Sequence, residues 1–147
     1  MLDADALVAL ERRLGYTFRD RDLLRRALTH ASYAHEHPPL PDNASLALLG
    51  DAVLALVVTE RLWAEARDLP VGVLTTQRAE LVAGAALARW AEHLELGAPL
   101  RLGRGEELSG GRDKGSVLAT AFEAVLGAVY VDGGLAAARA VVGRLTV

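Results

Sequence analysis

An apolar stretch at residues 43–58, NASLALLGDAVLALVV, carries a single ionisable side chain, that of Asp51. An isolated carboxylate is costly to bury, because an unpaired charge loses its hydration. Asp51 must therefore face a wet groove, meet a cation or become protonated. The apolar character of the stretch predicts a long central helix over about residues 43–66, and the other elements are expected to pack around it.

Apolar residues recur at helical spacing in further segments, and no segment alternates with the period of two that is typical of a strand. Helices are expected over residues 4–14, 22–30, 32–37, 43–66, 73–96, 116–130 and 135–145. The Pro-rich segment 38–43 and the glycine-rich segment 99–111 predict loops, and Asp-Gly-Gly at 132–134 predicts a helix stop. No linker divides the chain, so the sequence predicts one all-α domain, 1–147.

Charge and composition narrow the classes of function. The chain has no cysteine, which excludes disulfides and thiolate metal sites. Its net charge is −3 and Lys114 is its only lysine, so any contact with nucleic acid would depend on a local arginine stripe or a metal-loaded acidic groove. The start of the chain lacks the features of a signal peptide, and no uncharged apolar run reaches the roughly 18–20 residues of a membrane span. A cytoplasmic protein with no membrane contact is expected.

Four segments together resemble signatures of the ribonuclease III catalytic domain. ALTHASY at 27–33 resembles an early signature of that family, and NASLALLGDAV at 43–53 resembles its best-known signature, NERLEFLGDAV. LGRGEELSGGRDKGSVL at 102–118 and EAVLGAVYVDGG at 123–134 are similar to the second half of the domain. The segments occur in order and with the family's spacing, which makes the combination specific where a single motif would not be.

The resemblance implies the all-α ribonuclease III endonuclease-domain fold, assembled as a two-fold homodimer with a groove for double-stranded RNA. It also implies metal-dependent cleavage at clustered carboxylates, with Mg²⁺ or Mn²⁺ as the cofactor. The family usually carries a double-stranded-RNA-binding domain after the catalytic domain, and this chain is expected to lack one.

Most of the family's acidic positions are changed in this chain. The central signature of the family has two glutamates before its aspartate, where this chain has Ala44, Ala47 and then Asp51. Positions separated by three and four residues share one helix face, so the three family acids would point the same way. Here two of the three side chains are methyl groups, which cannot bind a metal.

The remaining family acids follow the same trend. One aligns near Val71, and a final aspartate and glutamate align with Thr120 and Glu123. The resemblance thus assigns the catalytic and metal-binding roles to Asp51 and Glu123 alone, and it implies that they face one another. Two carboxylates with waters and a phosphate can hold one Mg²⁺, whereas two-metal hydrolysis needs more ligands.

Two interpretations of function follow. The first is a ribonuclease III-like domain that is catalytically impaired or inactive, and that acts in RNA binding, processing or assembly. The alternative is an active Mg²⁺- or Mn²⁺-dependent endoribonuclease that uses Asp51 and Glu123. A ribosomal partner, or a heterodimer with a full-length ribonuclease III, also remains open.

Some of these residues could instead have structural roles. Asp51 could form an ion pair with Arg78 or Arg112 instead of binding a metal. The acids of the glycine-rich loop, Glu106, Glu107 and Asp113, could replace the lost ligands. Gly50 and Gly127 lie inside predicted helices, where glycine costs roughly 1 kcal/mol relative to alanine, so a close approach of two helices is expected there.

Two surfaces can also be predicted. RNA contacts are expected at Gln77, Arg78, Arg104 and Arg112, and they would read the shape of an A-form duplex rather than its sequence. The family's dimer is built along the central helix, where an aromatic residue of the family aligns with Leu48. Leu46, Leu48 and Leu49 are therefore expected at the dimer interface, because three apolar side chains together favour a buried partner surface.

Overall fold

The structure is a computed structural model that describes residues 4–146; the ends of the predicted domain, residues 1–3 and 147, lie outside the described residues. Between residues 4 and 146 every regular element is helical, and the only strand-like contact there is an isolated bridge between Thr29 and Arg101. The elements in chain order are α1 (Ala4–Leu14), α2 (Arg21–Ala27), α3 (Ala31–Glu36), α4 (Ala44–Ala66), α5 (Val71–Leu81), α6 (Gly84–His93), α7 (Arg104–Leu108), the 3₁₀ turn η1 (Gly111–Asp113) and α8 (Gly115–Leu145). The predicted all-α class is confirmed.

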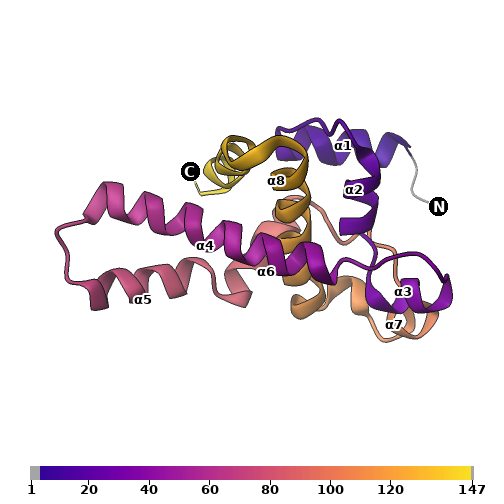
Figure 1. Ribbon diagram of the computed structural model, residues 1–147. Helices are drawn as coiled ribbons and strands as arrows, with labels where there is room; N and C mark the ends of the chain where they lie inside the picture. Colours follow the sequence, from indigo (N-terminus) through magenta and orange to yellow (C-terminus); the bar gives the residue numbers. More distant parts are fainter. Residues whose placement is uncertain (1–3, 147) are drawn as a thin grey trace.

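Helix α8 passes through the middle of the molecule, with α4 crossing it, α6 and α2 packed against it, and α1 above them in Figure 1. One hydrophobic cluster joins these helices, and fully buried members include Leu7, Leu24, Leu54 and Phe122. The hairpin formed by α4 and α5 projects away from this cluster. The core therefore lies at the α4–α8 crossing, and the hairpin extends beyond it.

The crossing of α4 and α8 is made possible by two glycines. A Cβ atom on Gly50 would lie 1.7 Å from the carbonyl oxygen of Glu123, and one on Gly127 would lie 2.2 Å from the carbonyl oxygen of Leu46. Both distances are far below van der Waals contact, so no side chain fits at either position. The predicted close approach of these two helices is confirmed.

The link between α1 and α2 is tied to α8 by Asp132. This carboxylate accepts hydrogen bonds from the Tyr16 hydroxyl at 2.6 Å and from the backbone N–H groups of Arg19 and Asp20 at 2.8 and 3.0 Å. Burial of the phenol, together with the hydrogen bond and charge of Asp132, raises the pKa of Tyr16 to about 12. Asp132 lies two residues before the kink at Gly134 (φ 82°), where the sequence predicts a helix stop.

Two predicted elements differ from the structure. The helix expected over 73–96 is broken at Ala83, whose extended backbone (φ −61°, ψ 147°) separates α5 from α6. The break lets α6 return to the core, where Trp90 packs on Phe122, while α5 follows α4 outward. The segment expected to be a loop over 99–111 contains α7, because the glycines that flank it permit a short helix between them.

Helix α8 is long and apolar enough to span a membrane by length and composition, which the count of uncharged residues in the sequence did not predict. Such a result also fits the core helix of a globular domain. Ala121, Phe122 and Val125 of this helix are buried in the hydrophobic cluster with α4 and α6.

The glycine crossing predicts the effect of adding one methyl group. Gly50→Ala should lower the free energy of unfolding by about 2–3 kcal/mol, because the helices must separate to admit the Cβ. Gly143→Ala is the matched control, since its Cβ would meet nothing within 4 Å; it should be neutral or stabilising by up to about 1 kcal/mol. Urea denaturation followed by circular dichroism measures both, and equal stabilities for the two variants would contradict the packing described here.

Candidate active site

The helix crossing brings Asp51 and Glu123 together. Asp51 directly follows Gly50 on α4, and Glu123 on α8 is the residue whose carbonyl oxygen lies against Gly50. Asp51 is exposed and Glu123 is half-buried. Burial of Glu123 raises its pKa to about 7, and the negative charge of Asp51 and a hydrogen bond between the two side chains add to this rise. Glu123 is therefore protonated in part of the molecules near neutral pH, where its carboxyl group hydrogen-bonds to Asp51.

The neighbours of this pair offer few ligands. Ala47 lies one turn before Asp51 and is buried, and Thr120 lies one turn before Glu123 and is half-buried. No group of three or more histidine or acidic residues between residues 4 and 146 is arranged to hold a metal ion. Mg²⁺ needs a near-octahedral set of oxygen ligands, and two ions need two such sets. The residues present here do not fit a two-metal centre.

Val71 lies away from the carboxyl pair. It is the first residue of α5, the helix that follows α4 along the hairpin, and is 78% exposed. The part of α4 between Asp51 and Ala66 spans roughly 22 Å at 1.5 Å per residue. Within one chain, an acid at position 71 would therefore not complete the site at Asp51.

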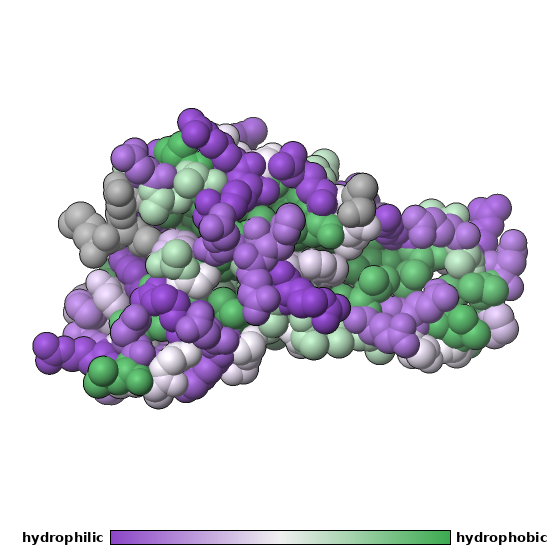
Figure 2. Space-filling view, turned by 180° about the vertical axis from the view of Figure 1, so that it is seen from behind, coloured by the Kyte–Doolittle hydropathy of each residue, from purple (hydrophilic) through white to green (hydrophobic). Residues whose placement is uncertain are grey.

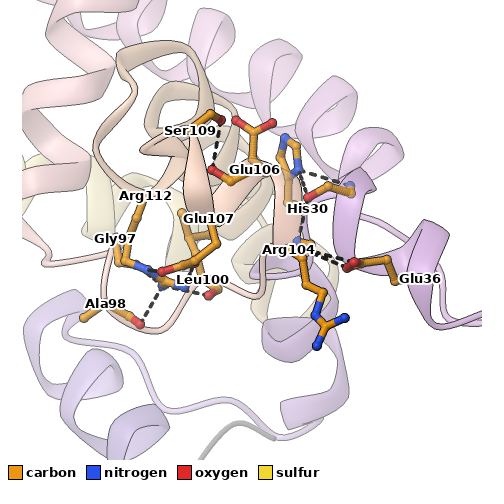
Figure 3. Close-up of polar contacts among 12 residues, drawn as sticks. His30, Glu36, Gly97, Ala98, Leu100, Arg104, Glu106, Glu107, Ser109 and Arg112 are labelled. Carbon is orange, nitrogen blue, oxygen red and sulfur yellow. Dashed lines mark hydrogen bonds and ion pairs between the residues drawn. The ribbon is translucent and has the colours of Figure 1, made fainter.

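Charged side chains of the glycine-rich loop form ion pairs with one another, among them Glu107 with Arg112 in Figure 3. Glu107 accepts hydrogen bonds from Nε and Nη2 of Arg112 at 3.1 and 2.5 Å. Glu106 pairs with Lys114 at 3.0 Å. These two glutamates are therefore already ion-paired within the loop and do not add carboxylates to the Asp51–Glu123 pair.

Arg112 binds backbone carbonyl groups of its own chain. Its Nη1 donates to the carbonyl oxygens of Gly97, Ala98 and Leu100 at 2.6, 3.0 and 2.8 Å. Its guanidinium is therefore neither the partner of Asp51 nor directed at a ligand, and we leave Arg112 out of the RNA-binding set that the sequence predicts. Single-sequence reasoning could not find this, since the three carbonyl oxygens are contributed by the backbone.

The other three residues predicted to contact RNA are Gln77, Arg78 and Arg104. The backbone N–H of Arg104 donates to both carboxylate oxygens of Glu36 at 3.0 and 3.1 Å, and its guanidinium extends away from them in Figure 3. Arg78 is exposed on α5 beside the half-buried Gln77. No carboxylate in the described part of the chain pairs with the guanidinium of Arg104 or of Arg78, so Arg78 is not the partner of Asp51 either.

His30 is placed as a structural residue. Its Nδ1 accepts from the backbone N–H of Ser32 at 3.1 Å, which caps the N-terminus of α3. The hydroxyl of Ser32 in turn accepts from the backbone N–H of Gly103 at 2.8 Å, so this cap also anchors the start of α7.

The three leucines predicted at a dimer interface do not share one surface. Leu46 is buried inside its own chain and Leu49 is partly buried against the same core, because both lie on the side of α4 that meets α8. Leu48 is 75% exposed. Leu56 and Trp63 are also exposed and lie on the same side of α4 as Leu48. These two residues extend an apolar stripe that the sequence motif did not include.

Comparisons with known proteins agree with this fold. The family model described as Ribonuclease-III-like matches residues 20–147. Similar curated proteins include Ribonuclease 3 of Caldanaerobacter subterraneus subsp. tengcongensis, 51% identical over 92% of this chain and 60% of that protein. Ribonuclease 3 of Streptomyces coelicolor is 54% identical over 97% of this chain and 51% of that protein. The chain thus spans about half to 60% of the length of these relatives.

Solved structures give the same result. A nuclease domain of ribonuclease III from Campylobacter jejuni matches with a TM-score of 0.88 and 39% sequence identity, over 93% of each chain. That structure is described for structural flexibility in its region involved in dimer formation. A second structure of the nuclease domain from the same organism matches with a TM-score of 0.88 and 38% identity, over 95% of this chain and 92% of that one.

The raised pKa of Glu123 predicts a pH dependence of stability. The native pKa of about 7 lies above the ordinary value of 4.5, so the native state binds the proton more tightly than the unfolded state. The resulting stabilisation is complete below pH 4.5 and is lost as the pH rises through 7. Glu123→Gln removes this titration, so the stability of the wild type relative to the variant should fall between about pH 5 and 8.

Urea denaturation at a series of pH values measures this difference. Glu107→Gln is the control, because hydrogen bonding by Arg112 lowers the pKa of Glu107 from its ordinary value of 4.5 and so keeps its titration below this window. Parallel stability curves for the wild type and Glu123→Gln across the window would show that the two carboxyl groups are not coupled.

Proposed function

Because the chain belongs to the ribonuclease-III-like family, we propose that it is an RNA-binding module of that family in which metal-dependent cleavage has been lost. It binds double-stranded or structured RNA as a homodimer and serves RNA processing or assembly. The observation that carries this proposal is the site at the helix crossing. Asp51 and Glu123 stand there beside Ala47 and Thr120, without the further carboxylates that a two-metal site requires.

The chemistry explains why two acids are too few. Hydrolysis of a phosphodiester by two ions requires that one ion activates a water while both neutralise charge on the phosphate. Asp51 and Glu123 supply at most two negative charges and few of the oxygen ligands that two ions need. The hydroxyl of Thr120 is an uncharged ligand, and the methyl side chains of Ala44 and Ala47 offer no metal ligand.

A second function is supported by the same pair. Asp51 and Glu123 remain adjacent, and one Mg²⁺ or Mn²⁺ could bind them when waters and an RNA phosphate complete its coordination. In that case the chain is a slow endoribonuclease rather than an inactive one. The two functions differ in a direct assay of cleavage.

The homodimer is proposed on the apolar stripe of α4. Leu48, Leu56 and Trp63 are exposed on one side of this helix, and Figure 2 shows hydrophobic side chains gathered along the hairpin that carries it. Exposed apolar groups that form a continuous patch are typical of an interaction surface. Leu46 is left out of the interface, because it is buried in the core of its own chain.

The RNA surface is proposed at Gln77, Arg78 and Arg104. Both arginines are exposed and lack a carboxylate partner in the described residues, so their guanidinium groups can reach phosphate. The contact would be independent of sequence, since proteins read duplex RNA mainly through its shape, phosphates and 2′-hydroxyls. With a net charge of −3, binding is expected to be weak and sensitive to salt.

Cleavage of long double-stranded RNA in Mg²⁺ or Mn²⁺ tests the proposal. The wild type should leave the RNA intact, whereas a variant with Ala44→Glu, Ala47→Glu, Val71→Glu and Thr120→Asp should cleave it at least about 100-fold faster, equivalent to about 2.7 kcal/mol of activation free energy. Asp51→Asn in that variant should abolish the gain. Metal-dependent cleavage by the wild type that Asp51→Asn removes would instead establish the slow endoribonuclease.

Gel-shift titrations with duplex RNA at several salt concentrations test the RNA surface. Arg104→Ala and Arg78→Ala should each weaken binding and reduce the slope of log affinity against log salt by about 0.9 for each phosphate that the variant no longer neutralises. Arg12→Ala on α1 is the charge-matched control and should leave both quantities unchanged. Equal behaviour of all three variants would place the RNA elsewhere on the molecule.

A further inference from the structure

A cavity of about 570 Å³ lies between α1, α3 and the loop that joins α6 to α7. Small-molecule sites in proteins have volumes of roughly 300–1,000 Å³, so a ligand of that class fits here. The lining of the cavity includes none of the residues proposed above for cleavage, RNA contact or dimerisation. The cavity is therefore a separate candidate site, and its side chains indicate which ligand it takes.

Three arginines line the cavity, and one of them has its donors occupied. The guanidinium of Arg112 is paired with Glu107 and donates to the carbonyl oxygens of Gly97, Ala98 and Leu100, as Figure 3 shows. It forms part of the wall of the cavity. The charges available to a ligand are those of Arg13 and Arg101.

Arg101 is a fixed cation without a carboxylate partner. Its Nε and Nη2 donate to the hydroxyl oxygen of Thr29 at 3.0 and 2.6 Å, and its guanidinium lies over the ring of Tyr33, 5.2 Å from the centroid. None of the ion pairs within residues 4–146 includes Arg101, and its Nη1 donates no hydrogen bond to those residues. A half-buried charge without a counter-ion is unfavourable, so this side of the cavity favours an anion.

Arg13 has only a weak counter-ion. Its Nε donates to the carbonyl oxygen of Leu94 at 2.7 Å, and its Nη1 lies 3.5 Å from a carboxylate oxygen of Glu95. The side chain of Glu95 is 68% exposed, and an exposed pair of this kind contributes little. A ligand that binds Arg13 more closely can therefore displace Glu95.

The position of Glu95 is unfavourable for α6 itself. Its backbone is left-handed (φ 55°), and no other non-glycine residue within 4–146 has a positive φ. Glu95 directly follows the C-cap residue Leu94, where glycine is the usual residue and a negative charge opposes the helix dipole. The helix end therefore does not explain a glutamate here, whereas a displaceable counter-ion for Arg13 does.

The remaining walls select the body of the ligand. Ala6 and Ala9 of α1 lie on one side, and Pro99 and Leu102 lie on the loop. These side chains offer no hydrogen-bonding group, so a body with many hydroxyl groups would leave some of them unpaired. A planar and weakly polar body fits this lining better.

We infer that this cavity binds a small organic phosphate of the nucleoside monophosphate type. Arg13 and Arg101 hold the phosphate group, and Ala9 and Pro99 contact the planar body. Two guanidinium groups match the charge of a phosphate dianion, and their forked donors match its oxygens. Binding displaces Glu95 from Arg13. The inference is independent of the RNA surface, of cleavage and of the homodimer.

Titration of the ¹⁵N-labelled chain, followed by the NMR signals of its backbone amides, tests the site. Adenosine 5′-monophosphate should give saturable shifts at residues 9–13 and 97–102. Inorganic phosphate and ribose 5-phosphate lack the planar body and should bind at least about tenfold more weakly, and adenosine lacks the charge and should not bind. The inference is overturned by an absence of saturable shifts at these residues, or by equal affinities for the nucleotide and inorganic phosphate.

Variants at the two ends of the Arg13–Glu95 pair make opposite predictions. Glu95→Gln should tighten nucleotide binding at least about threefold, because it removes the competing carboxylate; a misfolded variant would not show such a gain. Arg13→Gln should weaken binding at least about tenfold, and the amide spectrum of the free variant shows whether it is folded. Arg12→Gln is the matched control, since Arg12 lies on the same turn of α1 but lines a different cavity. Unchanged affinity in Glu95→Gln, or equal losses in the two arginine variants, would contradict the inference.

Two oligonucleotides identify the source of the phosphate. A single-stranded tetranucleotide with a 5′-phosphate that binds no more tightly than the free nucleotide would assign the site to free nucleotides. Tighter binding that the 5′-hydroxyl form lacks would assign it to the end of a strand. Equal binding of the two forms, at least as tight as that of the nucleotide, would show that no terminal phosphate is recognised and would overturn the inference.

Discussion

The structure depends on the contact between the backbones of α4 and α8 at Gly50 and Gly127. With a Cβ position 1.7 Å from the carbonyl oxygen of Glu123, Gly50 admits no side chain, and the two helices meet at main-chain distance. This contact places α8 through the centre of the core and sets Glu123 beside Asp51. The same two glycines that allow the fold thus also create the carboxyl pair. Both glycines are therefore required by the packing, whatever chemistry the carboxyl pair performs.

The fold and metal-dependent chemistry require different types of residue where α4 and α8 cross. The fold needs small and apolar residues where the helices touch, and Ala47 and Ala121 meet that need in the hydrophobic cluster. Metal-dependent chemistry needs several carboxylates held close together, which repel one another until cations bind. Ala47 and Thr120 carry no charge and add no such repulsion at the crossing. The α4–α8 contact is made by glycine and apolar side chains, so its packing is separate from the carboxyl pair beside it.

The sequence predicted the parts of the fold that follow from local pattern. The limits of α1 and α4, the stop before Gly134 and the close approach at Gly50 come from helical spacing and from glycine, which leave a local trace. The break at Ala83 does not, because it arises from the return of α6 to the core. Leu46 and Leu48 look alike in sequence, and only the position of α8 separates a core residue from an exposed one.

The contacts of the candidate site could also be predicted from the sequence only in part. The pairing of Asp51 with Glu123 followed from the resemblance and not from spacing, since the two residues lie on different helices. The structural position of Arg112 left no trace in the sequence, because its three partners there are backbone carbonyls of the loop after α6. The lack of buried side chains in α5 also became visible only once the burial of each residue was known.

A count of bound Mn²⁺ per chain tests most directly whether this chain holds a two-metal centre at Asp51 and Glu123. Electron paramagnetic resonance of free Mn²⁺ gives this number in the presence of duplex RNA, with Asp51→Asn as the reference. The account predicts that the wild type binds fewer than two ions at the Asp51–Glu123 site. Two ions per chain that disappear in Asp51→Asn would contradict it and establish a complete two-metal centre.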